Sequence, residues 1–168
     1  MHWIYWMKKQ LSTSQPTSKI YRKGVGIMLL NKERKIFVGQ RFDKDKSAWQ
    51  MPQGGIDKGE KSIEALKREL EEETGIKNNY EIIKKSKKKY KYQLPSYLQK
   101  KLWRGRFKGQ EQRWFLLQFI GIDSEINIQT EKPEFKKWKW VSKKELSLIH
   151  IRRCRRRLRC RSRWSPYH

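Results

Sequence analysis

Three glutamates at helical spacing are the residues of this chain best suited to chemistry. Glu69, Glu72 and Glu73 stand at positions i, i+3 and i+4, so a helix would place their carboxylates on one face. Glu71 falls on another side and is expected to be solvated. Like charges on one helix face repel each other unless a cation lies between them. Because ligand sets made only of oxygen suit Mg²⁺ or Mn²⁺ rather than Zn²⁺, the spacing predicts a site for a hard divalent cation.

The residues around these glutamates predict the helix that carries them. Ile63, Leu66 and Leu70 recur at helical spacing as an apolar stripe. Ser62 is a candidate N-cap and Gly75 a candidate stop. The three glutamates would lie along the edge of this stripe. A purely solvated acidic helix is the ordinary interpretation of such a charge run, but the residues just before the helix favour a site.

Those preceding residues form the loop Gly54-Gly55-Ile56-Asp57-Lys58-Gly59-Glu60. Gly54 and Gly55 allow the backbone to approach a metal ion or a phosphate closely. Glu60 ends the loop, and Arg68 stands immediately before the first of the three glutamates. Since an arginine fork suits a carboxylate, we expect Glu60 and Arg68 to hold the loop and the helix in register.

This segment resembles the Nudix box, G-x5-E-x7-R-E-U-x-E-E-x-G-U, in which U is a bulky aliphatic residue. Every fixed position is filled, by Gly54, Glu60, Arg68, Glu69, Leu70, Glu72, Glu73, Gly75 and Ile76. The resemblance to Nudix hydrolases implies an α/β fold, an α/β/α sandwich with a mixed sheet, and cleavage of a phosphorus anhydride. It implies that Glu69, Glu72 and Glu73 hold two or more Mg²⁺ or Mn²⁺ ions. One of the three would act as general base, and we favour Glu69.

The flanking sequence resembles one branch of that family, the bacterial RNA 5′-pyrophosphohydrolases with the dinucleoside polyphosphate hydrolases. The matching segments are residues 49–55, 109–117, 125–128 and 133–141. This resemblance implies that pyrophosphate is removed from the 5′-triphosphate end of RNA. Two alternatives stay open, asymmetric hydrolysis of diadenosine polyphosphates and an RNA-binding module without catalysis.

The same resemblance assigns residues outside the box. Glu134 would complete the metal shell, although by itself it is an ordinary surface acid. The positions that match the family's nucleic-acid contacts are Arg22, Arg41, Ser47, Tyr92 and Gln110. Each of these could equally be a solvated side chain. The family also continues with a C-terminal helix that bears a Phe-Lys pair, which is missing or replaced here by residues 149–152.

The formal net charge is +25 and the isoelectric point is about 10.3, which implies an anionic partner such as RNA or a polyphosphate. Lysines dominate residues 84–92, and two tyrosines are interleaved among them. Two interpretations of this run stay open. It is either a solvated strand edge that discourages pairing with other chains, or a surface that contacts phosphates of a nucleic acid.

The length of 168 residues suits one domain, which we place at residues 20–146. Residues 1–19 are expected to be a flexible extension. Residues 147–168 hold 8 Arg with no Lys and no acid, and their end resembles a one-frame translation of a sequencing adapter. We expect this tail to be artefactual or disordered; the alternative is an arginine-rich arm that binds nucleic acid.

Strands are expected at residues 25–30, 36–40, 80–83, 112–120, 126–128 and 135–141. The segment 95–109 is expected to be a long connection, and Ser142 a cap for a last helix that runs to Leu146. Both cysteines lie in the tail, so the rest of the chain fits a reducing cytoplasm. No apolar run reaches the length of a membrane span, and we expect a monomer that does not bind membranes.

Overall fold

The computed structural model of the protein describes residues 20–42, 49–94, 99 and 103–148. The chain divides into two compact units, residues 1–23 with 90–111, and residues 24–89 with 112–168. The expectations for residues 1–19 and 149–168, and the one for Ser47, lie outside the described residues.

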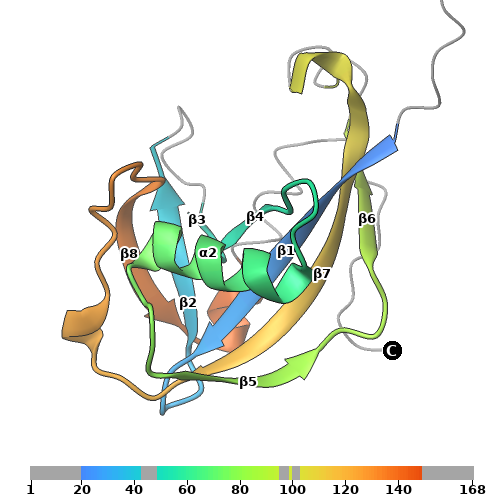
Figure 1. Ribbon diagram of the computed structural model, residues 1–168. Coiled ribbons are helices and arrows are strands. Elements are labelled where there is room, and N and C mark those ends of the chain that lie inside the picture. The colour runs from blue at the N-terminus through green and yellow to red at the C-terminus, as the bar shows by residue number, and fades with distance from the viewer. Residues whose placement is uncertain (1–19, 43–48, 95–98, 100–102, 149–168) are drawn as a thin grey trace, which may run out of the picture. The chain divides into compact units, whose positions relative to one another are not determined.

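One eight-stranded sheet is built along the path β3-β2-β1-β7-β5. The strands on that path are β1 (Ile20–Leu30), β2 (Ile36–Arg41), β3 (Trp49–Gln50), β5 (Tyr80–Lys85) and β7 (Phe107–Phe119). Off the path, β4 (Gln53–Gly55) pairs with β1, β6 (Tyr90–Gln93) with β7, and β8 (Phe135–Val141) with β2. The pairings β1–β2, β1–β4, β2–β3, β2–β8 and β5–β7 are antiparallel. Neighbouring β1 and β7 run in the same direction (Figure 1), so the expected mixed sheet is confirmed.

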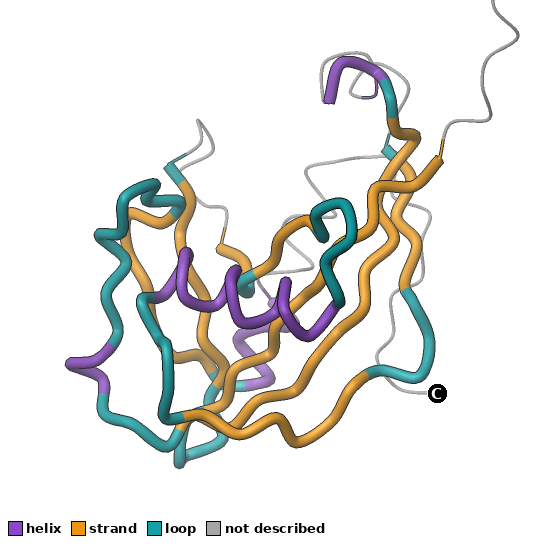
Figure 2. Tube along the Cα trace, viewed as in Figure 1, coloured by secondary structure: helices purple, strands orange, loops and turns teal. Residues whose placement is uncertain are grey.

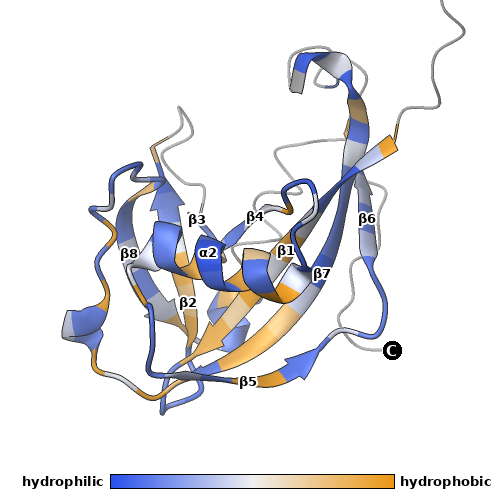
Figure 3. Cartoon of the chain, viewed as in Figure 1, coloured by the Kyte–Doolittle hydropathy of each residue, from blue (hydrophilic) through white to orange (hydrophobic). Residues whose placement is uncertain are grey.

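Helix α2 (Ser62–Thr74) covers one face of this sheet (Figure 1). Leu66 and Leu70 are fully buried and pack in one cluster with Val25, Phe37 and Leu117 of the sheet. Figure 3 shows the consequence, because the outer face of the helix is hydrophilic while the strands behind it are hydrophobic. Burial of this apolar stripe is the main force that holds α2 in place.

The opposite face of the sheet has a second core. Ile36 and Val38 of β2 lie in it, whereas Phe37 between them lies in the first, as alternation along a strand requires. Leu146 joins this second core from a helical turn at residues 143–148. Ser142 Oγ accepts the N–H of Glu145 at 3.2 Å, so the expected cap is confirmed. The two layers on either side of the sheet agree with the expected sandwich.

The ends of α2 show one expected and one different cap. Gly75 adopts φ 73°, and its N–H donates to the carbonyl oxygen of Glu71 at 2.8 Å, which confirms the glycine stop. Ser62 is not the N-cap, because the helix begins at that residue and Lys61 keeps an extended backbone. The carboxylate of Glu64 accepts the N–H of Lys61 at 2.9 Å instead. Glu64, the third residue of the helix, thus satisfies the N–H of the N-cap residue, as the acid of a capping box does.

Two other expectations about elements were wrong. No strand forms at residues 126–128, which follow the 3-10 helix η2 (Asp123–Glu125) as irregular chain (Figure 2). Asn127 Oδ1 accepts the N–H of Gln129 at 2.9 Å, and this local bond competes with a strand ladder. Strand β7 begins at Phe107, earlier than expected, after the 3-10 helix η1 (Trp103–Gly105). In the described part of the chain, no helix is long and apolar enough to cross a membrane.

Candidate active site

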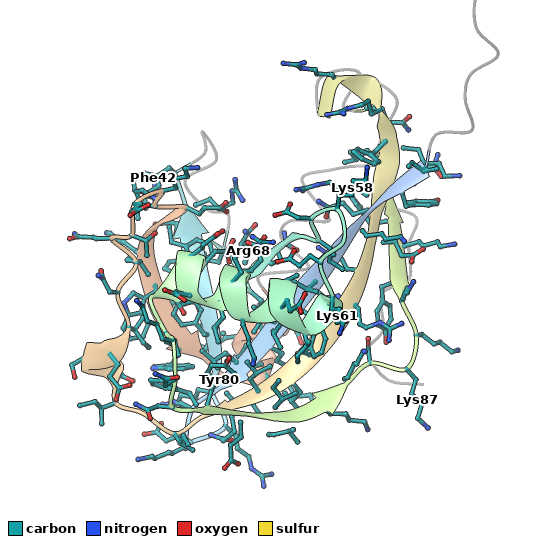
Figure 4. The ribbon with its side chains drawn as sticks, in the orientation of Figure 1. Phe42, Lys58, Lys61, Arg68, Tyr80 and Lys87 are labelled. Carbon is teal, nitrogen blue, oxygen red and sulfur yellow. The ribbon has the colours of Figure 1, made fainter. Side chains whose placement is uncertain are left out.

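Arg68 joins α2 to the loop that precedes it (Figure 4). Its Nε and Nη2 donate to the two carboxylate oxygens of Glu60, at 2.9 and 3.0 Å, and Nη2 also donates to the carbonyl oxygen of Gly55 at 2.8 Å. The remaining nitrogen, Nη1, donates to Glu69 Oε1 at 2.8 Å and to Glu72 Oε2 at 3.3 Å. A planar guanidinium makes this bidentate arrangement with directional bonds. Arg68 therefore fixes the loop relative to two of the three glutamates.

Glu60 is the carboxylate that this fork satisfies. Its Oε2 also accepts the N–H of Asp57 at 2.9 Å, which ties the two ends of the loop turn together. The hydrogen bonds from Arg68 lower the pKa of Glu60, and the bond to Glu60 raises the pKa of Arg68. Both shifts favour the charged forms, so this pair is a stable ionic joint.

Glu69 lies against the backbone of the loop. A Cβ on Gly54 would overlap the Glu69 carboxylate, so a glycine is required for that approach. Glu69 is only 7% exposed. Burial raises the pKa of its carboxyl, the bonds from Arg68 oppose this effect, and the charges of Glu72 and Glu134 add to it.

Glu73 is the most deeply buried carboxylate of the group, with 2% of its surface exposed. Its Oε2 accepts the N–H of Gln53 on β4 at 3.0 Å. Its Oε1 is buried and has no hydrogen-bond donor among the described residues. Burial raises the pKa of Glu73 well above the usual range, and the nearby charge of Glu134 raises it further. A carboxylate in this position needs a cation or a proton.

Glu134 stands directly before β8, far from α2 in the sequence, and its charge acts on Glu69 and Glu73. The residue after it, Phe135, is 1% exposed and stands against Gly39, where a Cβ would overlap the phenyl ring. Phe135 also lies opposite Arg41 in the β2–β8 register. This anchor brings Glu134 Oε2 to 3.2 Å from Arg41 Nη1. Arg41, expected as a nucleic-acid contact, thus lies beside the acids and forms an ion pair with one of them.

Glu72 is the exposed member of the group, since 57% of its side chain is accessible. Thr130 Oγ1 donates to its backbone carbonyl at 2.7 Å, which ties the last turn of α2 to the segment before β8. The helix therefore presents two buried carboxylates and one accessible carboxylate, rather than three equal ones. Burial of Glu69 and Glu73 follows from their position at the edge of the apolar stripe.

The acids fit a hard divalent cation by chemistry. Every side-chain donor is a carboxylate oxygen, and Glu73 Oε1 is buried without a hydrogen-bond donor in the described chain. Within residues 20–42, 49–94, 99 and 103–148, however, no three acid, histidine or cysteine side chains converge closely enough to hold one ion. Arg68 Nη1 donates to oxygens of both Glu69 and Glu72. The guanidinium is an internal counter-charge for part of the acid group.

The other expected contacts belong to the smaller unit. Arg22 on β1 and Gln110 on β7 are half-buried, and Tyr92 on β6 is 37% exposed. In the same unit, Lys108 Nζ and Lys91 Nζ lie 4.6 and 5.4 Å from the ring centre of Tyr21. The part of Arg22, Tyr92 and Gln110 in substrate binding stays a prediction.

Sequence reasoning missed Gln53 and Gln112. Gln53 holds Glu73 through its backbone N–H, and its side-chain Oε1 accepts Gln112 Nε2 at 2.9 Å. The available signal was their place inside the two flanking motifs, with Gln53 directly before Gly54. A pattern based on charged side chains cannot detect a contribution made by the backbone.

Comparisons with known proteins identify relatives of this chain. An RNA pyrophosphohydrolase of Pelagibacter ubique is 53% identical over 120 residues, which cover 71% of this chain and 75% of that protein. One of Rickettsia canadensis is 54% identical over 131 residues, covering 78% and 81%. A structure of the E. coli dihydroneopterin triphosphate pyrophosphohydrolase matches with a TM-score of 0.60 at 20% identity, over 78% of this chain and 88% of that one.

A fourth match, a C. elegans Ap4A hydrolase in a binary complex, has a TM-score of 0.59 at 20% identity, over 77% of this chain and 86% of the other. At these identities the two structures support the fold alone. The NUDIX domain family matches residues 20–160, which include the loop, α2 and Glu134. The chain therefore belongs to the Nudix hydrolase family.

Proposed function

We propose that this protein removes pyrophosphate from the 5′-triphosphate end of RNA in a metal-dependent hydrolysis. The proposal is supported by relatives above 50% identity that are RNA pyrophosphohydrolases, and by the general use of divalent metals among Nudix hydrolases. The observation that carries it is Glu73, whose buried oxygen lacks a donor among the described residues while three other carboxylates lie nearby.

Four carboxylates would hold the metal in this proposal: Glu69, Glu72, Glu73 and Glu134. Two or more Mg²⁺ or Mn²⁺ ions, when bound, supply positive charge that neutralises phosphate oxygens. The chain keeps its acids in position by three means, which are the fork of Arg68, the backbone N–H of Gln53 and the anchor at Phe135. The missing Cβ of Gly54 leaves the space that the Glu69 carboxylate occupies against the loop.

Glu69 is the residue that we propose takes the proton from the attacking water. Its pKa is raised by burial, and a base works best when its pKa is near the working pH. Arg68 holds Glu69 by Oε1 at 2.8 Å. The proton can then be accepted at Oε2, for which the structure describes no hydrogen bond.

The test is turnover of purified full-length protein on three substrates with added Mg²⁺ or Mn²⁺. These are 5′-triphosphorylated RNA, the same RNA with a 5′-hydroxyl, and diadenosine tetraphosphate. We expect release of pyrophosphate from the first RNA only, at a higher specific activity than any cleavage of the dinucleotide. Chelation of the metal should abolish it.

Two results would overturn the proposal. Faster cleavage of the dinucleotide would make diadenosine polyphosphates the substrate class. Binding of RNA without turnover at any metal concentration would identify a binding module. Action in the cytoplasm and a monomeric state remain predictions, which localisation of a tagged protein and sedimentation of the purified protein can check.

A further inference from the structure

A dense run of lysines follows the end of β5 and leads toward β6. We call Lys84, Lys85, Lys87, Lys88 and Lys89 the basic strip. All five side chains are exposed, and the strip contains no acid. Lys84, Lys87 and Lys88 have no ion-pair partner among the described residues. This much unpaired like charge in a short segment repels itself unless an anion is nearby.

The strip is held in a defined shape by the residue in its middle. Ser86 N donates to the carbonyl oxygen of Trp114 at 2.8 Å, and Ser86 Oγ accepts the Trp114 N–H at 3.0 Å. The same hydroxyl donates to the carbonyl oxygen of Lys88 at 2.8 Å. A serine that bonds both the neighbouring strand and the turn fixes the backbone of the strip. The lysines around it therefore project from an ordered surface.

Protection of an open sheet edge is the simplest explanation for lysine here. Strand β5 ends the path of the sheet and pairs with β7. One or a few charged side chains are enough to blunt such an edge. Lys87, Lys88 and Lys89 lie in the turn between the last residue of β5, which is Lys85, and the first of β6, which is Tyr90, so they stand outside both strand ladders. Edge protection leaves most of the strip unexplained.

The basic strip carries the positive charge that the four glutamates of the cleavage site lack. Glu69, Glu72, Glu73 and Glu134 repel a phosphate chain, so that the cleavage site by itself disfavours the body of an RNA substrate. Figure 4 shows Lys87 beyond the end of α2 at which the helix begins, on the side where the loop carries Lys58 and Lys61. Because salt screens charges beyond roughly 8 Å, the strip acts on RNA that runs directly over it.

We propose that the basic strip binds the sugar-phosphate backbone of single-stranded RNA downstream of the 5′ end. The inference rests on the proposed function for its biological setting, but the binding itself does not require hydrolysis. The strip contacts phosphates and reads no sequence. The affinity that it adds grows with the length of the RNA.

The experiment compares two triple variants of the full-length chain. The strip variant carries Lys84→Gln, Lys87→Gln and Lys88→Gln. The matched control carries Lys32→Gln, Lys77→Gln and Lys144→Gln, which removes the same charge from exposed positions elsewhere. The probe is a labelled 5′-hydroxyl RNA of about 20 nucleotides, with affinity measured over a range of salt concentrations. On single strands each lost phosphate contact lowers the slope of log K against log salt by about 0.7, so we expect a loss of about 2 in the strip variant.

The control variant should keep the wild-type slope. Equal slopes in the two variants would overturn the proposal, and so would binding of the strip to anionic lipid vesicles in place of RNA. A 5′-hydroxyl RNA carries no pyrophosphate, so this result is independent of whether the proposed reaction occurs. With 5′-triphosphorylated RNAs of increasing length, the KM defect of the strip variant should grow with length while kcat stays constant.

Discussion

Glu60 and Glu73 are the same residue type in the same motif, yet their surroundings act on them in opposite ways. Glu60 receives two hydrogen bonds from Arg68, which lower its pKa. Glu73 is buried beside Glu134, and its pKa is raised well above the usual range. The first carboxylate is satisfied by the protein itself. The second is charged only at a cost, because its Oε1 has no hydrogen-bond donor among the described residues, and the bond from Gln53 N–H satisfies Oε2 alone.

The two shifts have opposite effects on stability. A lowered pKa means that Glu60 stabilises the folded state above its unfolded pKa, and that this contribution is lost as pH falls through the folded pKa. A raised pKa means that the metal-free fold is most stable with Glu73 protonated. Its stability then falls as pH rises from the ordinary glutamate pKa through the folded value. The comparison separates Glu60, which holds the loop to α2, from Glu73, which we propose holds a metal ion.

Glu73→Gln should have the largest effect, and it should change both turnover and stability. We expect turnover to fall by about a hundredfold to a thousandfold, the scale of removing a main electrostatic group. The metal-free variant should also be more stable than wild type by about 1–3 kcal/mol near neutral pH, because a buried unsatisfied charge is removed. This difference should shrink toward pH 4. Kinetics and urea unfolding across pH measure both effects.

The control for that prediction is Glu71→Gln on the exposed side of α2. It should leave turnover and the pH dependence of unfolding at wild-type values. A Glu73→Gln variant that is less stable than wild type at every pH would show that the carboxylate of Glu73 is satisfied after all.

Gly54→Ala should disturb the site through a single methyl group. A Cβ at this position overlaps the Glu69 carboxylate, so that Glu69 must move. A displacement of roughly 1 Å near reacting groups can cost about a hundredfold in rate. The neighbouring Gly59 adopts φ 84° with open space around it. Gly59→Ala should therefore strain the loop and lower stability while it costs less turnover, and equal turnover losses would contradict this view of Gly54.

Much of the site was predictable because the signals were local. The acids of α2, the loop glycines and the partnership of Glu60 with Arg68 all follow from spacing within one segment. The bond from the backbone of Gln53 to Glu73 was not readable, since it depends on how α2 packs against β4. Glu134 was available only through a family resemblance, because β8 reaches the acids through sheet pairing and the anchor at Phe135.

The fold shows the same limit. Apolar alternation predicted the strands β2, β7 and β8. It failed at residues 126–128, where two isoleucines suggested a strand. There, the backbone of Asn127 bonds to Thr74, and its side chain bonds to Gln129. Burial of Ile126 and packing of Ile128 are achieved by an irregular segment, so apolar spacing alone could not distinguish the two structures.

Arg68→Lys tests the scaffold half of the comparison, which is the pairing of Arg68 with Glu60. Lysine keeps the charge but loses the fork that holds Glu60 and Gly55 together. We expect metal affinity to fall by about tenfold to a hundredfold, as for other residues that orient metal ligands. The pKa of Glu60 should move back toward its ordinary value. Calorimetric titration with Mn²⁺ and a pH series of unfolding give readouts that do not depend on turnover. Unchanged metal affinity would leave Arg68 a purely structural residue.

Arg41→Gln tests an exposed ionic contact of the group and should have the smallest effect. The side chains of Arg41 and Glu134 are 33% and 43% exposed, so water screens their attraction. In a double-mutant cycle with Glu134→Gln, we expect a coupling free energy of at most about 1 kcal/mol. The cycle of Arg68→Gln with Glu60→Gln should give more, about 1.5–3 kcal/mol, because the fork is less exposed and bidentate. If the Arg41 pair coupled as strongly as the fork, Glu134 would belong to the scaffold together with Glu60, and the acids left for a metal would be those of α2 alone.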